Sequence, residues 1–256
     1  MPLDNSTYSL ARLRLDGRRA HELRRLSAQL HTQAAADGSA YFEQGNSKVI
    51  CTVAGPSESK RRGGANSSEQ IQDATVEVEV NFAGFSGTDR RKRARGDKRT
   101  AELAHTVSSA FTSTLLLHLY PHSTITLTLH VLSQSGSLLA TCLNASTLAL
   151  IDAGIPMLAP LAAVTVATTA AYADNEEDAD VLLDVNEQEE VELPFLTIAG
   201  TGEGEGVRVL VLESRVQMGR LEGMIAVGLE GVRRVRGVLD RIVREHGERV
   251  LEGKVG

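Results

Sequence analysis

Two carboxylates, Asp184 and Glu190, are the residues whose type and spacing best suit chemistry. Asp184 follows the apolar run Val181-Leu182-Leu183, which predicts a strand, and Glu190 comes six residues later in a predicted loop. Two carboxylates beyond the end of a strand can hold a divalent cation or act as general acid and base. Acids this dense also occur together by chance, so a structural or solvent-facing role is the expectation for either one alone.

Clustered basic residues form the second candidate site. Residues 90–99 read RRKRARGDKR, with seven basic side chains and one acid, and Lys60-Arg61-Arg62 forms a smaller cluster. Closely spaced Arg and Lys release counterions from phosphates, so this run suits a polyanion-binding loop as well as a solvated one. The run contains no aromatic residue, so base stacking is not indicated there. The net charge is −6, and an acidic run at 174–192 has ten acids and no base.

Other common catalytic signatures are missing from the sequence. The seven histidines form no HxH or HExxH pattern, and Pro121 separates His118 from His122, so we expect no histidine metal site. The glycine-rich stretch 200–206 contains two glutamates, which repel phosphate, and a predicted strand follows it. It is therefore expected to be a hairpin turn. There is no GxSxG nucleophile elbow.

The composition is that of a soluble globular protein. The 256 residues are 42% hydrophobic and 23% charged, with 4 Tyr, 5 Phe and no Trp, so the core is expected to be aliphatic. Cys51 and Cys142 match no metal spacing and are expected to be buried thiols in a reducing compartment. Residues 1–25 contain no apolar run, which excludes a secretory signal. The uncharged stretch 103–151 is interrupted by polar residues and Pro121, so no membrane span is expected.

Periodicity predicts an alternation of strands and helices that would position these residues. Residues 74–80 and 123–132 alternate apolar and polar side chains as half-exposed strands do. A hairpin is predicted over 38–54, and further strands near 162–170, 181–185, 193–199 and 207–213. Helices are predicted over 98–119, over 137–152 and from about Met218 onward. This order predicts an α/β sandwich with mixed sheets and packed helices.

Six segments then occur in an order that identifies a family. Together they resemble the RNase PH family, in particular the eukaryotic exosome core subunits related to the catalytic subunit of the archaeal exosome. The segments are LRLDGRR (13–19), ADGSAYFEQGNSKVICTVAGP (36–56), DKRTAE (97–102), NASTLALIDAGIPM (144–157), LLDVNEQEE (182–190) and MGRLEGMIAVGLEGVRRVR (218–236). The resemblance implies one domain over residues 1–256, with its core at about 10–245.

The resemblance also implies a fold, an assembly and a reaction. The fold is an α/β (α+β) RNase PH fold, like domain 2 of ribosomal protein S5. Six such subunits form a ring around a channel that admits single-stranded RNA, with cap subunits and an associated hydrolytic nuclease as partners and no membrane. Active members use inorganic phosphate to cleave the 3′-terminal phosphodiester. The family works in the nucleus, nucleolus and cytoplasm, in ribosomal RNA processing and RNA degradation.

The family's functional residues match this chain only in part. The RNA- and phosphate-binding arginine matches Arg99, and its basic neighbour matches Lys98. The key aspartate matches Asp184, and the second acid, usually Asp in active relatives, matches Glu190. The phosphate-binding Ser-Arg pair falls on Leu138-Leu139. Each lost charged hydrogen bond is worth roughly 1.5–3 kcal/mol, so phosphorolysis is expected to be lost, leaving Asp184 and Glu190 as vestigial candidates.

Three hypotheses follow. The first is a non-catalytic ring subunit whose basic residues guide RNA along the channel to a separate nuclease, without cofactor or metal. The second is an active phosphate-dependent 3′→5′ exoribonuclease, in which main-chain amides near Gly136 and Ser137 hold phosphate and Mg²⁺ accompanies the residual activity. The third is a purely architectural subunit. The residues expected to bind RNA are Arg62, Lys98 and Arg99, assisted by Lys60, Arg61, Arg93 and Arg95.

Overall fold

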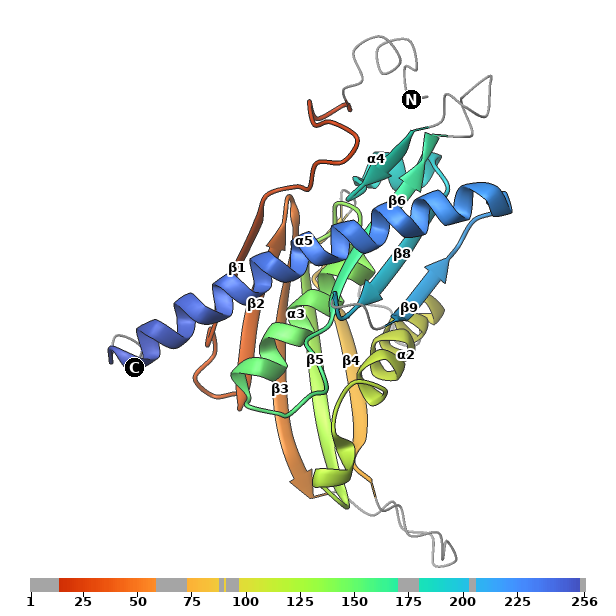
Figure 1. The fold of residues 1–256 in the computed structure, drawn as a ribbon. Helices are drawn as coiled ribbons and strands as arrows, with labels where there is room; N and C mark the ends of the chain where they lie inside the picture. Colours follow the sequence, from red (N-terminus) through yellow and green to blue (C-terminus); the bar gives the residue numbers. More distant parts are fainter. Residues whose placement is uncertain are drawn as a thin grey trace, which may run out of the picture.

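Two β-sheets form the frame of the molecule (Figure 1). The structure is a computed structural model that describes residues 14–58, 73–87, 90, 97–169, 180–202 and 206–253. The first sheet has the order β1-β2-β3-β5-β4, in which only the β4–β5 pair is parallel. Its strands are β1 (Leu26–Leu30), β2 (Gly38–Gln44), β3 (Ser47–Glu58), β4 (Thr75–Phe82) and β5 (Ser123–Ser133).

The second sheet is antiparallel throughout and has the order β7-β6-β8-β9. Its strands are β6 (Ala162–Thr168), β7 (Val181–Leu183), β8 (Phe195–Gly200) and β9 (Val207–Leu212). Every residue of β6 is buried, because helices cover both faces of this sheet. The glycine-rich stretch that follows β8 joins it to the antiparallel β9, which confirms the predicted hairpin connection.

Helices fill the space between the sheets and cover the outside of the second one (Figure 1). Helix α3 packs on β2 and β3 on one side and on β6 and β8 on the other, and residues 140–150 are all buried. A helix that is buried all round carries apolar residues on every face, and the buried polar side chains of α3, such as Asn144 and Thr147, bond to backbone groups. The helices are α2 (Lys98–Thr112), the 3-10 helix η1 (Leu117–Leu119), α3 (Leu138–Asp152), α4 (Glu187–Glu192) and α5 (Met218–Leu251).

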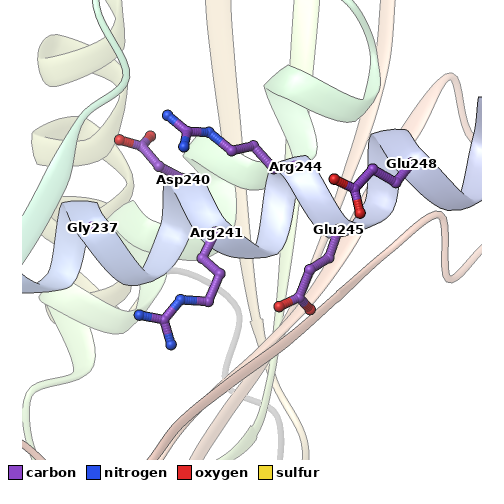
Figure 2. Close-up of a pocket in the computed structure, with 6 residues that line it drawn as sticks. All are labelled: Gly237, Asp240, Arg241, Arg244, Glu245 and Glu248. Atoms are coloured by element: carbon purple, nitrogen blue, oxygen red, sulfur yellow. The ribbon is translucent and has the colours of Figure 1, made fainter.

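The long helix α5 crosses the second sheet and reaches β1 (Figure 1). Two glycines allow its close approach: a Cβ atom at Gly228 would lie 2.4 Å from Ile198 Cδ1, and one at Gly231 would lie 2.4 Å from Leu183 Cδ1. The opposite side of α5 is charged. Figure 2 shows six residues of its C-terminal half that line a shallow hollow on this helix, namely Gly237, Asp240, Arg241, Arg244, Glu245 and Glu248.

Most of the predicted elements are present, and the C-terminal end of one predicted helix needs correction. The helix expected over 98–119 ends at Thr112, where the hydroxyl groups of Ser113 and Thr114 donate to the Ala110 carbonyl. The chain then turns toward residues 156–158, and Leu115 forms a bridge with Met157. Leu115 and Leu117 beyond this point pack against the core, and they do not extend α2.

Two short elements were not predicted. Strand β1 is only five residues long, alternates apolar and polar side chains, and pairs along its whole length with β2. Helix α4 replaces the loop expected around Glu190, and a capping box between Asn186 and Glu189 starts it. Cys51 and Cys142 are both free and buried, as predicted. Among the described residues, no helix is long and apolar enough to span a membrane.

Candidate functional site

The carboxylate of Asp184 lies at the centre of a buried polar network. Asp184 is fully buried, directly after β7, and its backbone has a φ of 59°. Oδ1 accepts hydrogen bonds from Arg24 Nη2 at 2.7 Å, Gln44 Nε2 at 2.8 Å and Arg24 Nε at 3.0 Å. Oδ2 accepts from the Arg24 backbone N–H at 2.7 Å. The carboxylate is therefore paired and hydrogen-bonded on both oxygens, as a buried charge must be.

Arg24 connects this carboxylate to the loop before α3. Its Nη1 atom donates to the Ser135 carbonyl at 2.7 Å, and the Ser47 hydroxyl donates to the next carbonyl, of Gly136, at 2.8 Å. Gly45 makes room for the arginine, because a Cβ atom there would lie 2.6 Å from Arg24 Cδ. Arg24 is 8% exposed, so its guanidinium acts inside the protein and is not presented to a ligand.

Two further arginines hold the turn between β7 and α4. Arg14 donates to the Leu183 and Asp184 carbonyls at 2.6 and 2.8 Å, and its Nε donates to Glu189 Oε1 at 2.8 Å. Arg18 donates to the Asp184 carbonyl at 3.1 Å and to Asn186 Oδ1 at 3.3 Å. Arg14 and Glu189 are both buried. These contacts hold the segment from Arg14 to Arg18 against the turn that carries Asp184.

Ser137 lies between the two candidate carboxylates at the start of α3. Its hydroxyl donates to the Val185 carbonyl at 2.9 Å and lies 3.4 Å from Asp184 Oδ1. Its backbone N–H lies close enough to the Glu190 carboxylate to lower the pKa of that group. Ser137 therefore lies near both candidate carboxylates.

The chain approaches itself closely at this point. A Cβ atom at Gly136, where φ is 82°, would lie 2.5 Å from the Asn186 carbonyl carbon. Leu138 and Leu139 follow in the first turn of α3, half-buried against the hydrophobic core. Both side chains are apolar, so they offer no hydrogen bond to an anion.

Burial raises the pKa of Glu190. The Ser137 N–H and the charge of Arg24 oppose this shift, and the nearby carboxylates of Glu213 and Glu187 add to it. Glu190 is therefore a partly desolvated anion that sits where the amides at the start of a helix attract negative charge.

Of the basic residues expected to bind RNA, the structure describes Lys98 and Arg99. They are the first two residues of α2, both exposed, and Asp97 caps the helix by accepting from the Arg99 N–H at 3.3 Å. Before this helix, Ser86 accepts a hydrogen bond from Gln134 N–H at 2.8 Å, beside the loop that leads to Ser137. The other predicted RNA-binding residues lie outside the described residues: Lys60, Arg61, Arg62, Arg93 and Arg95.

The site offers structural polar contacts rather than an open set of metal ligands. No group of three His, Cys, Asp or Glu side chains in the described part of the chain could hold a metal ion. Sequence reasoning singled out Asp184 and Glu190 but missed Arg14, Arg24 and Gln44, which hold the aspartate and its turn. Arg14 and Gln44 carried a signal, because they lie within the family segments at 13–19 and 36–56, whereas Arg24 lies in neither.

Comparisons with known proteins agree with this architecture. The family model described as "3' exoribonuclease family, domain 1" matches residues 22–156, and the model for domain 2 of the same family matches residues 163–231. Among solved structures, rice (Oryza sativa) Rrp46 is similar with a TM-score of 0.73 and 25% identity, over 89% of this chain and 98% of that one.

Curated relatives are similar over nearly their whole length. The exosome complex component SKI6 of Saccharomyces cerevisiae is 36% identical over 94% of this chain and 94% of its own. The human exosome complex component RRP41 is 34% identical over 91% of each chain. The fold, the two matched family models and these relatives together show that this chain belongs to the RNase PH (3′ exoribonuclease) family.

Proposed function

We propose that this chain is a non-catalytic RNase PH-like subunit of an RNA exosome ring, which guides single-stranded RNA through the central channel to an associated hydrolytic nuclease. Its similarity to named exosome components over nearly the full length supports membership of such a ring. The partners are then other RNase PH-like subunits, cap subunits and the nuclease. The complex acts in the nucleus, nucleolus and cytoplasm, in ribosomal RNA processing and RNA degradation.

The observation that carries the lack of catalysis is a carboxylate of the chain itself, Glu190, near the α3 N-terminus. Phosphate held by main-chain amides near Ser137 would meet this carboxylate, whose pKa the Ser137 N–H already lowers. Two like charges about 4 Å apart repel by about 4 kcal/mol near a protein surface. Leu138 and Leu139 supply no charge to offset this repulsion. The arrangement therefore disfavours a phosphate dianion at this position.

The contacts of Asp184 support the same conclusion. A general acid or a metal ligand needs an oxygen that faces the substrate or the ion. Both oxygens of Asp184 face protein donors, and the residue is fully buried. Its role in this chain is to position Arg24 and the loop before α3. No cofactor is part of this proposal, and Mg²⁺ has a place only if residual phosphorolysis exists.

Lys98 and Arg99 support the RNA-guiding role. Cations in the first turn of a helix lie at the positive end of its dipole, an arrangement that costs about 0.3–1 kcal/mol per charge. Both residues are exposed at this unfavourable place, and α2 has no acid in its first turn. Local sequence choices that work against stability tend to mark functional sites. A phosphate backbone passing this helix end would meet the two cations Lys98 and Arg99 beside the capping carboxylate of Asp97.

The test is charge reversal in the assembled ring. Lys98→Glu with Arg99→Glu should reduce the length and yield of single-stranded RNA protected from an added nuclease, because the phosphates lose two cations and meet two anions. The double variant should fold at least as stably as the wild type, since acids suit a helix N-terminus.

Arg241→Glu with Arg244→Glu is the matched control. It makes the same change in net charge on the outward hollow of α5 (Figure 2) and should leave protection unchanged. Equal protection by the wild type and the Lys98/Arg99 variant would contradict the RNA-guiding role and favour a purely architectural subunit.

A further inference from the structure

An exposed aromatic side chain, Phe85, lies on the turn that follows β4. Phe85 is 72% exposed, whereas Phe42 and Phe111 are fully buried in the core. A single exposed apolar side chain is ordinary on a protein surface, so its position decides what it can do. Residues 90–99, which carry the basic run, contain no aromatic residue, and Phe85 supplies one just before them.

The turn that carries Phe85 is fixed by backbone hydrogen bonds. The Ser86 N–H donates to the Ala83 carbonyl at 2.9 Å, which closes a β-turn. The Ala83 N–H donates to the Val131 carbonyl at 2.9 Å, and the Gln134 N–H donates to the Ser86 carbonyl at 2.8 Å. Both ends of the turn are therefore bonded to β5 or to the loop that leads to α3, and they present the aromatic side chain from a fixed base.

Helix α2 runs antiparallel to β4 (Figure 1). The hydroxyl of Ser108, in the second half of the helix, donates at 2.8 Å to the carbonyl of Val76, near the start of the strand. Just before the strand, the Ala74 N–H donates at 3.3 Å to the carbonyl of Leu117, which follows the helix. The end of α2 and the start of β4 therefore lie together, so the start of α2 lies toward the end of β4.

This direction brings Lys98 and Arg99 to the end of the strand that leads to Phe85. From Ser108 back to Lys98 the helix covers about 15 Å, and from Val76 to the end of β4 the strand covers about 20 Å. Lys98 and Arg99 are exposed, as Phe85 is. One end of the first sheet thus offers an exposed aromatic side chain and two exposed cations.

An aromatic side chain beside cations suits single-stranded nucleic acid. Proteins that bind single strands combine cations that follow the phosphates with aromatic side chains on which bases stack. The bases of a single strand are not paired, so they can turn out toward such a platform. Stacking tolerates any sequence because every base has a π face, and this suits a path that accepts many RNAs.

We propose that Phe85 is a base-stacking residue for single-stranded RNA, and that it acts together with the phosphate contacts of Lys98 and Arg99. This inference rests on the proposed function, because it requires RNA to pass the start of α2. It adds a contact with the bases to contacts that otherwise reach only the phosphate backbone. The stack raises the affinity for RNA without selecting a sequence.

Binding of RNA by the reconstituted ring, without any nuclease, tests this role. Affinities are measured for a labelled single-stranded RNA and for an abasic ribose-phosphate strand of the same length. Phe85→Ala should weaken binding of the RNA roughly five- to a hundredfold, because one base–aromatic stack is lost, and should leave binding of the abasic strand unchanged. Phe85→Trp keeps a stacking platform and should bind RNA at least as well as the wild type.

Leu158→Ala is the matched control. Leu158 is 61% exposed, and its N–H donates at 2.9 Å to the carbonyl of Thr114, beyond the opposite end of α2. The control should bind both strands as the wild type does. Its exposed side chain is apolar like that of Phe85, so it reports any general effect of removing surface apolar area.

Two results would overturn the proposal. Impaired assembly of the ring with Phe85→Ala, or an equal loss of affinity for both strands, would make Phe85 a contact between protein subunits. Unchanged RNA binding by Phe85→Ala would show that no base stacks there. Lys98→Glu with Arg99→Glu then separates the two proposals: weaker RNA binding by that variant would leave the RNA-guiding role standing, and unchanged binding would remove both.

Discussion

Asp184 shows how a residue with the right identity for catalysis can serve the fold instead. Its carboxylate is the common acceptor for Arg24 and Gln44, and its carbonyl accepts from Arg14 and Arg18. Four side chains from separate parts of the chain therefore meet at one residue. Removing the charge would leave a buried guanidinium without its partner, which is a costly state.

The first prediction at this scale concerns stability. Asp184→Asn should lower the free energy of unfolding by about 3–5 kcal/mol, measured by urea denaturation of the full chain. Asp240→Asn is the matched control, because Asp240 also pairs with an arginine, Arg236, but is part-exposed on α5. It should cost at most about 1 kcal/mol. Equal costs for the two variants would mean that Asp184 does not hold the network together.

The second prediction concerns the pH dependence of stability through Glu190. Burial raises its pKa above the ordinary value of 4.5, so the folded state binds this proton more tightly than the unfolded chain. The stability that the protonated group contributes is present below about pH 4.5 and is lost as pH rises through the folded pKa. Glu190→Gln carries no charge to lose, so its stability relative to the wild type should increase from about pH 4 to about pH 7.

Urea denaturation across this pH range provides the measurement, and Glu248→Gln on the exposed side of α5 is the control. The control should show no such gain, because its carboxylate is solvated. A constant difference between Glu190→Gln and the wild type would show that burial does not penalise the charge of Glu190.

What sequence reasoning found and missed at this scale has a physical cause. Asp184 and Glu190 stand out because acids after an apolar run are unusual and match a family motif. Arg24 gave no signal, since its partner lies 160 residues away and only the tertiary fold brings them together. The sequence shows leucines at 138 and 139, but not that Glu190 comes near the Ser137 N–H.

At the scale of elements, glycine residues let α5 pack closely on the second sheet. The third prediction compares Gly228→Ala with Gly237→Ala on the same helix. A Cβ at Gly228 would lie 2.4 Å from Ile198 Cδ1, so the change should cost about 1–3 kcal/mol by overpacking. Nothing lies within 4 Å of a Cβ at Gly237, so alanine there should stabilise the helix by about 0.5–1 kcal/mol.

Urea denaturation of the two variants measures the change in unfolding free energy. Both changes raise the intrinsic helix propensity equally, so a difference between them reports packing against the second sheet. A stabilising effect of Gly228→Ala would show that the second sheet yields to the extra methyl group. Opposite signs for the two variants would establish that α5 and the sheet pack through Gly228.

Elements with strong periodicity were predicted well. The alternation of Val76, Val78 and Val80 with Glu77 and Glu79 appears in β4 as inward and outward sides. Helix α3 was predicted from its length and its stop at Gly154, and its start agrees within a residue. Strand β1 was missed although its five residues alternate apolar and polar side chains, because a run this short gives a weak signal. Helix α4 was missed although its Asn-x-x-Glu capping signature is present in the sequence.

At the scale of the whole molecule, the layering of two sheets around a buried α3 could not be derived from periodicity. The expectation of mixed sheets with packed helices is confirmed, and its detail came from the family resemblance. Strand β9 forms an edge of the second sheet, and Val207, Leu210 and Leu212 on it are exposed. Exposed apolar edges call for a covering partner, which fits the proposal that this chain works within a ring.

The central claim is that this ring subunit carries no phosphorolytic activity. The most direct measurement follows end-labelled single-stranded RNA with the reconstituted ring and Mg²⁺, with and without inorganic phosphate, and without any hydrolytic nuclease. We predict no phosphate-dependent release of nucleoside diphosphates, because the Glu190 carboxylate lies near the Ser137 N–H and two leucines follow Ser137 in α3. Phosphate-dependent release that disappears with Arg99→Ala, a change at an exposed residue, would contradict the account and make the chain an enzyme.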